Sequence, residues 1–256
     1  MAMNEKISYL EDHLRRWPRA ALLFSGGLDS SLLLAAAARV LGPDLTAITF
    51  TGPHTVPGQL AAAYALARRF GVKHLIREFD PLALPRFREN TRERCYVCKR
   101  AIIERGLKMA AAVGAPALWD GTNLDDLADF RPGMQAAREL GVVSPLLAAG
   151  LGKAAIRVLS RALGLPWDKA PQSCLATRFP HDTPLTREAL ARIGQGEAWL
   201  RRRGFRHVRL RLNSAGVRLE LTAEEWPAFL APGVQGPFGA LVTRLGFGRL
   251  SLDFPR

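Results

Sequence analysis

The stretch Ser25-Gly26-Gly27-Leu28-Asp29-Ser30 follows an apolar run, Ala20–Phe24, and opens a Leu- and Ala-rich segment, Ser30–Leu41. The apolar run predicts a buried strand, and the Leu/Ala segment predicts a helix buried between layers. Two consecutive glycines let the backbone turn tightly and approach a ligand without an obstructing Cβ. The helix that follows would direct free N–H groups and its positive dipole end at an anion. The stretch therefore predicts an α/β fold with a phosphate-binding loop.

Each polar residue of this loop has a candidate role. Ser25 and Ser30 would add hydroxyl donors. Asp29 would be repelled by phosphate unless it meets a cation, so Mg²⁺ is its expected partner. The alternative for Ser25 or Asp29 is a helix N-cap after a glycine turn. The candidate nucleotide-binding residues of the loop are Ser25, Gly26, Gly27, Asp29 and Ser30.

Short apolar runs alternate with helical patterns outward from the loop, which predicts a doubly wound, mostly parallel sheet with helices on both faces. The alternation of strand and helix patterns ends after Arg178. The pattern of an amphipathic helix, followed by that of a hairpin around Asn-Ser-Ala-Gly, predicts a small α+β part. We expect two domains, residues 1–175 and 176–256. The predicted strands are 20–24, 45–50, 73–79, 117–120, 208–212, 217–221 and 250–254, and the predicted helices are 30–41, 59–70, 98–113, 186–203 and 224–230.

Composition sets the wider expectations. The chain has 256 residues, a net charge of +13 and three cysteines. The odd and low cysteine count favours a reducing cytoplasm. The longest early apolar run is too short for a membrane span, so no membrane partner is expected. The excess of arginine favours anionic ligands in general. The sequence has no Lys/Arg tail of the kind that would indicate nucleic-acid binding.

The loop lacks the Gly-Lys-Ser/Thr of a Walker P-loop. It resembles the PP-loop of the ATP pyrophosphatase superfamily, whose fold is adenine nucleotide alpha hydrolase-like. The resemblance implies that the loop holds the pyrophosphate part of ATP and that AMP activates a substrate oxygen. Asp120-Gly121-Thr122-Asn123, with Asp125, resembles the second nucleotide-side loop of that superfamily.

The three cysteines lie in two small motifs. Cys95 and Cys98 form a Cys-x-x-Cys pair at the head of a predicted helix, and Cys174 lies in Ser173-Cys-Leu-Ala-Thr-Arg-Phe-Pro180. A structural zinc site would require a fourth ligand, and a redox pair would leave Cys174 unexplained. A 4Fe-4S cluster with one open iron would use all three thiolates.

Several motifs in order resemble the LarE-type sulfur insertases, which help to build a nickel-pincer nucleotide cofactor. They are the PP-loop, Asp129-Phe-Arg131-Pro-Gly133, Ser173-Cys174 with Arg178-Phe-Pro180, and Val208-Arg209-Leu-Arg211. The resemblance implies an ATP-dependent enzyme that adenylylates a carboxylate of pyridinium-3,5-biscarboxylic acid mononucleotide and converts it to a thiocarboxylate. It leaves the sulfur source open. In single-cysteine members the residue matching Cys174 gives up its own sulfur, whereas three-cysteine members bind 4Fe-4S.

The resemblance also assigns roles to charged residues. Arg131 would contact the nucleotide, and Arg209, Arg211 and Glu197 would form a site for the substrate phosphate. Arg178 would neutralise AMP or a substrate carboxylate near Cys174. The alternatives are a solvated strand face for Arg209 and Arg211, a surface carboxylate for Glu197, and a structural salt bridge for Arg178.

Two other function classes remain as alternatives. A PP-loop tRNA thiolase would explain the positive charge, although no RNA-binding appendage is recognisable. A nucleotide-sensing scaffold would need no intact Asp29, Ser30 or cysteines. We therefore expect ATP, Mg²⁺ and a 4Fe-4S cluster as cofactors, an anionic mononucleotide as substrate, no nucleic-acid partner and a homo-oligomer, the last taken from the family.

Overall fold

The computed structural model describes residues 3–128, 132–169 and 173–254. Its contacts divide the chain into two compact units. Unit 1 comprises Met1–Gly52, Gln59–Asp80 and Glu93–Pro171, and unit 2 comprises Pro53–Gly58, Pro81–Arg92 and Gln172–Arg256. A compact unit is not necessarily an independently folding one, so the boundary between residues 175 and 176 stays a prediction.

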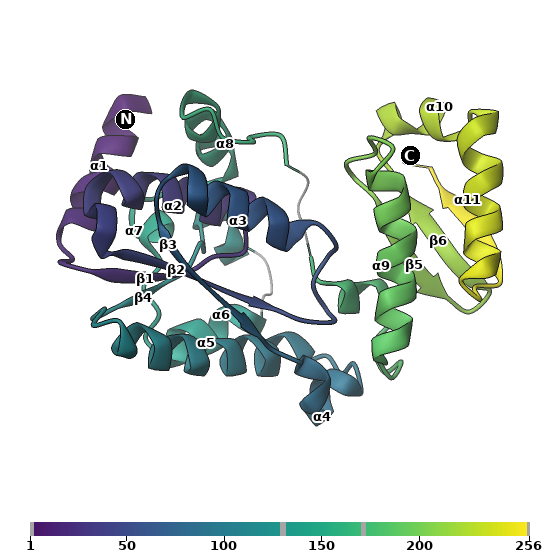
Figure 1. Cartoon of the computed structure of the whole chain (residues 1–256), viewed down its shortest axis with the longest axis horizontal. Helices are drawn as coiled ribbons and strands as arrows, with labels where there is room; N and C mark the ends of the chain where they lie inside the picture. The colour runs from purple at the N-terminus through teal and green to yellow at the C-terminus, as the bar shows by residue number, and fades with distance from the viewer. Residues whose placement is uncertain (1–2, 129–131, 170–172, 255–256) are drawn as a thin grey trace. The chain divides into compact units, whose positions relative to one another are not determined.

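Unit 1 is built on a parallel four-stranded sheet of order β3-β2-β1-β4 (Figure 1). Ala20 of β1 pairs with Leu45 of β2 on one side, and Ala21 pairs with Leu118 of β4 on the other. The sheet thus places β1 in its centre and brings the carboxyl ends of all four strands to one edge. The strands are β1 (Ala20–Leu23), β2 (Leu45–Thr51), β3 (Lys73–Glu78) and β4 (Leu118–Trp119).

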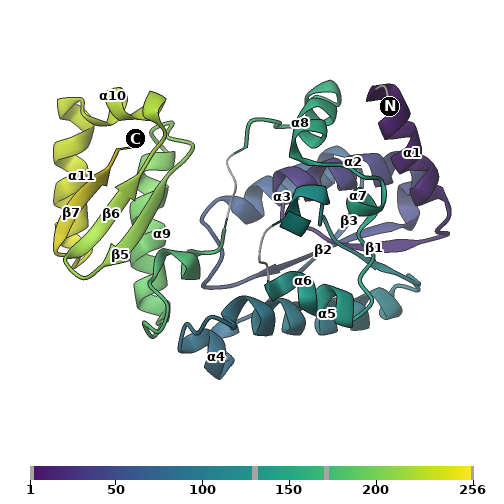
Figure 2. The same ribbon diagram turned by 180° about the vertical axis from the view of Figure 1, so that it is seen from behind.

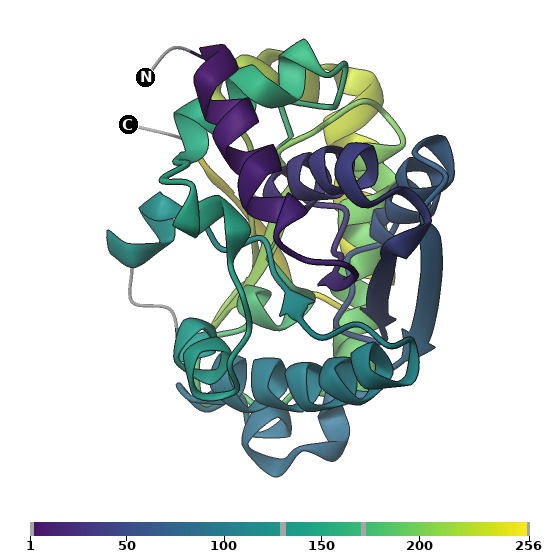
Figure 3. The ribbon, with the colours of Figure 1, turned by 90° about the vertical axis from the view of Figure 1, so that its left-hand side faces the viewer.

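Helices cover both faces of this sheet, as Figures 2 and 3 show. Successive side chains of a strand point to opposite faces. Accordingly Ala20 and Leu22 join a core with one set of helices, and Ala21 and Leu23 join a core with the other set. The first set is α1 (Met3–Arg15), α2 (Leu28–Leu41), α3 (Gln59–Arg69), α7 (Pro145–Ala148) and α8 (Lys153–Ala162), and the second is α5 (Arg94–Ala112) and α6 (Pro132–Glu139).

These two cores confirm the prediction of a parallel α/β sheet flanked by helices. Among the described helices, none combines the length and the apolarity needed to cross a bilayer. Helix α5 begins at Arg94, so it includes both Cys95 and Cys98, whereas the sequence predicted a start at Cys98. The short elements that belong to unit 1 are the 3-10 turns η1 (Gly42–Asp44) and η3 (Leu124–Ala128).

Unit 2 contains a three-stranded sheet of order β5-β6-β7, in which β5 and β6 are antiparallel and β6 and β7 are parallel. One face of the sheet is apolar, with Leu210, Val217 and Leu219 fully buried. Gly196 of α9 lies so close to β5 that a Cβ there would be 2.7 Å from Leu210 Cδ2. The other elements of unit 2 are η2 (Pro81–Ala83), α4 (Pro85–Arg88), η4 (Leu175–Arg178), α9 (Arg187–Arg201), β5 (Arg209–Asn213), β6 (Gly216–Glu220), η5 (Ala223–Glu225), α10 (Trp226–Phe229), α11 (Pro232–Arg244) and β7 (Arg249–Asp253).

Candidate functional site

The glycine loop of unit 1 joins the carboxyl end of β1 to the first turn of α2. Gly26 has a φ of +71°, and a Cβ there would lie 2.9 Å from Ala63 Cβ. Both the backbone conformation and the space therefore require glycine. Gly27 is the N-cap of α2 and offers no side chain to the helix, so no N-cap side chain competes for the N–H groups of the first turn.

Hydroxyl groups line the inside of this turn. Ser25 Oγ and Ser30 Oγ lie 3.1 Å apart, and the N–H of Gly27 donates to Ser25 Oγ at 3.3 Å. The amide of Gln59 in α3 donates to the carbonyl oxygen of Ser25 at 3.0 Å. The loop thus presents backbone N–H groups, two hydroxyls and a helix N-terminus together, which is the arrangement that binds anions.

Asp29 in the first turn of α2 is paired with a lysine from a distant helix. Lys153 Nζ lies 2.5 Å from Asp29 Oδ2. The other carboxylate oxygen of Asp29 is buried and has no hydrogen-bond partner among the described residues. A buried carboxylate oxygen with no donor fits a Mg²⁺ ligand, because Mg²⁺ is bound through one or two carboxylates together with substrate phosphates.

A second lysine contacts the loop from the chain segment after α8. Lys169 Nζ donates to the carbonyl oxygen of Gly26 at 2.8 Å. Burial lowers the pKa of Lys169, because its ammonium group has lost part of its hydration. Lys153 and Lys169 together place two cationic side chains around the loop.

The Asp120-Gly-Thr-Asn123 segment follows β4 and packs against the same helix start. A Cβ at Gly121 would lie 3.0 Å from the backbone nitrogen of Ser30, so glycine allows this close approach. Asp125 accepts the backbone N–H of Lys153 and so caps α8. The predicted contact of Asp125 with the nucleotide stays a prediction.

Asp120 connects this segment to the cysteine-bearing helix. Its carboxylate accepts hydrogen bonds from Thr122 and from Ser144 Oγ at 2.8 Å, and it pairs with Lys99 Nζ at 3.2 Å. Burial by itself would raise the pKa of Asp120, but Lys99 and these hydrogen bonds outweigh it and lower the pKa. Asp120 therefore stays charged while 3% exposed.

Cys95 and Cys98 lie in the first turn and a half of α5, and Lys99 directly follows Cys98. Residues three and four apart share a helix face, so the two thiols and the Lys99 ammonium lie on one side of α5. Cys95 is exposed and Cys98 half-buried. Gly133 of α6 packs here, since a Cβ would lie 3.4 Å from Lys99 Cβ and 3.8 Å from the Cys95 carbonyl oxygen.

The predicted nucleotide ligand Arg131 lies outside the described residues. Its neighbour in the same motif, Pro132, begins α6.

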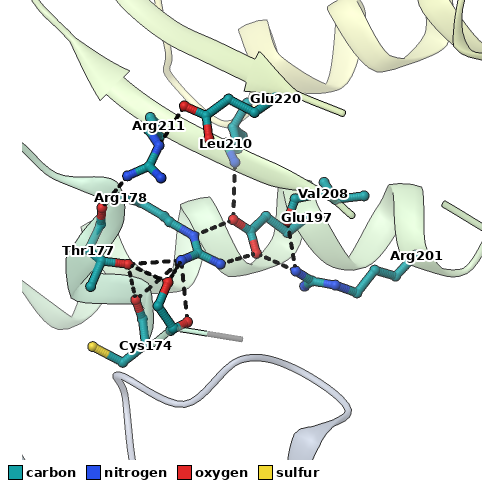
Figure 4. Close-up of polar contacts among 10 residues, drawn as sticks. Cys174, Thr177, Arg178, Glu197, Arg201, Val208, Leu210, Arg211 and Glu220 are labelled. Carbon is teal, nitrogen blue, oxygen red and sulfur yellow. Dashed lines mark hydrogen bonds and ion pairs between the residues drawn. The ribbon is translucent and has the colours of Figure 1, made fainter. Parts of the chain in front are cut away.

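Arg178 and Glu197 form a buried ion pair in unit 2 (Figure 4). Their side chains are 2% and 0% exposed, and Arg178 Nε lies 2.7 Å from Glu197 Oε1. Glu197 also accepts from Arg201 at 2.6 Å and from the backbone N–H of Leu210 at 3.0 Å. The network joins η4, α9 and β5, so Arg178 has the structural salt bridge that the sequence left as its alternative, and its predicted contact with AMP or substrate stays a prediction.

Cys174 is held at the start of η4 by its backbone. Its carbonyl oxygen accepts from Thr177 N at 3.0 Å and Thr177 Oγ1 at 2.8 Å, and the following N–H, of Leu175, donates to the carbonyl oxygen of His54 at 2.9 Å. Figure 4 shows the Cys174 sulfur directed away from the Arg178 network. The backbone is fixed while the thiol is left half-exposed.

Arg209 and Arg211 project from the polar face of β5. Arg211 donates to Glu220 Oε1 at 2.6 Å and to the carbonyl oxygen of Thr177 at 2.9 Å. Burial lowers the pKa of Arg209, and the positive charges of Arg178 and Arg211 lower it further. Arg209 therefore lies near two other guanidiniums, and such a cluster favours binding of an anion.

The donor set for an iron–sulfur cluster is divided between the units. Cys95 and Cys98 belong to unit 1 and Cys174 to unit 2. None of the three is in a disulfide, so each can supply a thiolate, and the i, i+3 spacing fits two ligands from one helical turn. Within either unit, the described residues contain no group of three or more metal-binding side chains.

Sequence reasoning gave no role at the site to Lys153, Lys169, Arg201 or Glu220. For Lys153 a signal was available, because a lysine at the first position of a helix opposes the helix dipole and implies another role. Lys169 and Glu220 are recognised only through partners on other segments of the chain. Arg201 lies four residues after Glu197 on α9, a spacing that could have indicated their ion pair.

Comparisons with known proteins add the following. Residues 10–93 match the asparagine synthase family. The chain is 33% identical over 246 residues to the pyridinium-3,5-bisthiocarboxylic acid mononucleotide synthase of Lactiplantibacillus plantarum, which covers 94% of this chain and 87% of that protein. It is 37% identical over 252 residues to an uncharacterized protein, slr1717, of Synechocystis sp., covering 98% and 94%. It is 32% identical over 205 residues to a 7-cyano-7-deazaguanine synthase of Cyanothece sp., covering 65% and 88%.

Proposed function

This chain belongs to the family of the pyridinium-3,5-bisthiocarboxylic acid mononucleotide synthases, and from that membership we propose that it is an ATP-dependent sulfur transferase. Its proposed substrate is pyridinium-3,5-biscarboxylic acid mononucleotide, one carboxylate of which becomes a thiocarboxylate. The observation that carries the proposal is the glycine loop with Asp29 and Lys153. The same chain has three neighbouring arginines, Arg178, Arg209 and Arg211, and three free thiols.

The first step is adenylylation. A substrate carboxylate oxygen attacks the α-phosphorus of ATP, a P–O bond to pyrophosphate breaks, and an acyl-adenylate forms. The N–H groups of the first turn of α2, the hydroxyls of Ser25 and Ser30, and the ammonium of Lys153 stabilise the leaving pyrophosphate. Asp29 would hold Mg²⁺, which neutralises phosphate charge.

The second step transfers sulfur. A nucleophile at the sulfide level attacks the acyl carbon, a C–S bond forms, and the C–O bond to AMP breaks, so that AMP leaves as a phosphate anion. No external oxidant is required, because the carbon keeps its oxidation state. If Cys174 is the donor, its Cβ–S bond is then eliminated and dehydroalanine remains in the chain.

Cys95, Cys98 and Cys174 would hold a 4Fe-4S cluster, which when bound would supply sulfide-level sulfur on its open iron. Lys99, paired with Asp120, orients the α5 turn that carries the first two thiols. Fixation of the Cys174 backbone by Thr177 and His54 presents the third thiol.

Pyrophosphate release tests the proposal. We expect release from ATP only when the biscarboxylate mononucleotide is present, and a product whose mass has exchanged one oxygen for sulfur when a sulfide donor is added. Asp29→Asn should abolish release, whereas Asp12→Asn, on the surface of α1, should not. Release that ignores the mononucleotide, or release without sulfur in the product, would disprove this function.

A further inference from the structure

A cavity of about 250 Å³ lies between η4 and the β5–β6 hairpin in unit 2. Three of the residues that line it are arginines: Arg178, Arg211 and Arg218. Arg178 is already committed to Glu197, so Arg211 and Arg218 are the cavity's adaptable cations. The side chain of Arg218 is 46% exposed, which leaves it room to move.

Strand register places Arg211 and Arg218 directly opposite each other. They are Cα partners in the antiparallel β5–β6 pair, so their side chains leave the same face of the sheet. Like charges directly opposite on a sheet repel, and the arrangement persists only with a counter-ion. Glu220 is the counter-ion that the two arginines share, and its Oε1 accepts from Arg211 Nε at 2.6 Å and from Arg218 at 3.1 Å. Arg218 Nε also lies 3.4 Å from Asp253 Oδ2.

The charges around the cavity remain unbalanced despite Glu220. The pKa of Arg209 is lowered by burial and by the positive charges of Arg178 and Arg211. The charged side chains of this network are five arginines and three carboxylates. The arginines are Arg178, Arg201, Arg209, Arg211 and Arg218, and the carboxylates are Glu197, Glu220 and Asp253.

We propose that Arg218 binds the substrate phosphate together with Arg211, and that Glu220 is the internal counter-ion which the phosphate displaces. The identification of the ligand as a mononucleotide rests on the proposed function, whereas the affinity for a phosphomonoester rests on the cavity alone. A phosphomonoester carries nearly two negative charges at neutral pH and three acceptor oxygens. Two guanidiniums therefore gain more from it than from one shared carboxylate oxygen.

This arrangement predicts opposite effects from two residues that are bonded to each other. Arg218→Gln removes a ligand contact and should weaken phosphate binding. Glu220→Gln removes the negative charge that Arg211 and Arg218 share and that repels a phosphate, so it should tighten binding. If the Arg218–Glu220 pair only stabilised the hairpin, the two substitutions would act in the same direction.

The test is calorimetric titration of the full chain with nicotinamide mononucleotide and, separately, with inorganic phosphate. Arg218→Gln should weaken binding of both about tenfold, as loss of a charged hydrogen bond does, and Glu220→Gln should strengthen it about threefold or more. Nicotinamide riboside, which lacks the phosphate, should respond to neither change. Arg249→Gln, on the neighbouring strand β7, serves as the matched charge control.

Weakening by both substitutions, or equal effects of Arg218→Gln and Arg249→Gln, would overturn the proposal. Thermal unfolding of each variant shows whether the fold is intact. The assay contains no ATP and no sulfur donor, so its result is separate from that of the proposed function. Binding with the expected signs but no thiocarboxylate would keep the site and reject the reaction, and thiocarboxylate formation without a phosphate effect would do the reverse.

Discussion

Lys153 occupies a helix position that is unfavourable for a cation. It stands at the first position of α8, where the helix dipole disfavours a cation, and its side chain reaches Asp29 across 124 residues of sequence. Its ammonium group lies beside the glycine loop, where we expect it to bind the pyrophosphate part of ATP. Lys153→Met should slow ATP-dependent pyrophosphate release about 10- to 100-fold, the range for losing a hydrogen bond to a charged group.

Lys153→Arg should retain part of the activity, because the charge is kept while its geometry changes. Lys108→Met, an exposed lysine on α5, is the matched control and should behave as the unaltered chain. Equal activity of the Lys153→Met and Lys108→Met variants would show that Lys153 serves α8 alone.

His74 gives a prediction about pH. The Thr49 hydroxyl donates to the carbonyl oxygen of Phe24 at 2.5 Å, so His74 Nε2 must donate to Thr49 Oγ1, 2.7 Å away. The other ring nitrogen, Nδ1, is buried without a hydrogen-bond partner among the described residues, so a second proton there would have no acceptor. Burial lowers the pKa of His74 below 6.5, because protonation would place an unpaired charged N–H in the interior.

The sign of the pH effect follows from this lowered pKa. Above pH 6.5 the ring is neutral in both the folded and unfolded chain. As the pH falls from 6.5 toward the folded-state pKa, the unfolded chain binds the proton first and stability is lost. His74→Gln keeps a donor for Thr49 and does not titrate. Its denaturation midpoint should therefore fall less between about pH 7 and pH 5 than that of the unaltered chain, and parallel curves would contradict this account.

At the scale of elements, the Arg178–Glu197 pair fastens η4 to α9 and β5. Glu197→Ala would leave the guanidinium of Arg178 buried without its counter-charge and should lower the free energy of unfolding by about 3–5 kcal/mol. The double variant Arg178→Met/Glu197→Met removes both charges and should recover much of this loss. Glu104→Gln, which breaks the exposed Arg100–Glu104 pair, should leave the free energy of unfolding nearly unchanged. Chemical denaturation of the full chain measures all three, and a double variant as unstable as Glu197→Ala would refute the ion-pair account.

Elements with strong local patterns were predictable from the sequence, and elements stabilised by packing were not. The buried run at β1 and the glycine loop are adjacent in sequence, so both could be recognised together. Helix α11 was missed, because Pro232, Gly233, Gly236, Pro237 and Gly239 all oppose helix formation. Its apolar side chains Phe238, Leu241 and Val242 are buried, and this packing outweighs the poor propensity.

The candidate site shows the same division. The loop residues, the cysteines and the alternation of Arg209 and Arg211 follow from short motifs. The partners Lys153 of Asp29 and Glu220 of Arg211 depend on which elements the fold brings together. Arg178 illustrates the limit, since its motif indicated charge near Cys174 but its buried ion pair is a property of the packed unit.

At the scale of the whole molecule, the two candidate sulfur sources make different demands on the three cysteines. Cys95 and Cys98 are contributed by α5 of unit 1, and Cys174 by the start of η4 in unit 2. A cluster would require all three thiolates, and a ligand that binds only the folded state stabilises that state. A sacrificial Cys174 would need no contribution from the other two thiols.

We therefore expect anaerobically reconstituted protein to contain about four irons and four sulfides per chain and to lose them in each of Cys95→Ala, Cys98→Ala and Cys174→Ala. The loaded chain should unfold at a higher temperature than the iron-free chain, because the cluster would bind only the folded chain. Iron analysis, calorimetry and the intact mass after turnover check this on the same samples. Iron retained in the Cys95→Ala and Cys98→Ala variants would show that these cysteines are not cluster ligands. A chain lighter by one H₂S after turnover would assign sulfur delivery to Cys174.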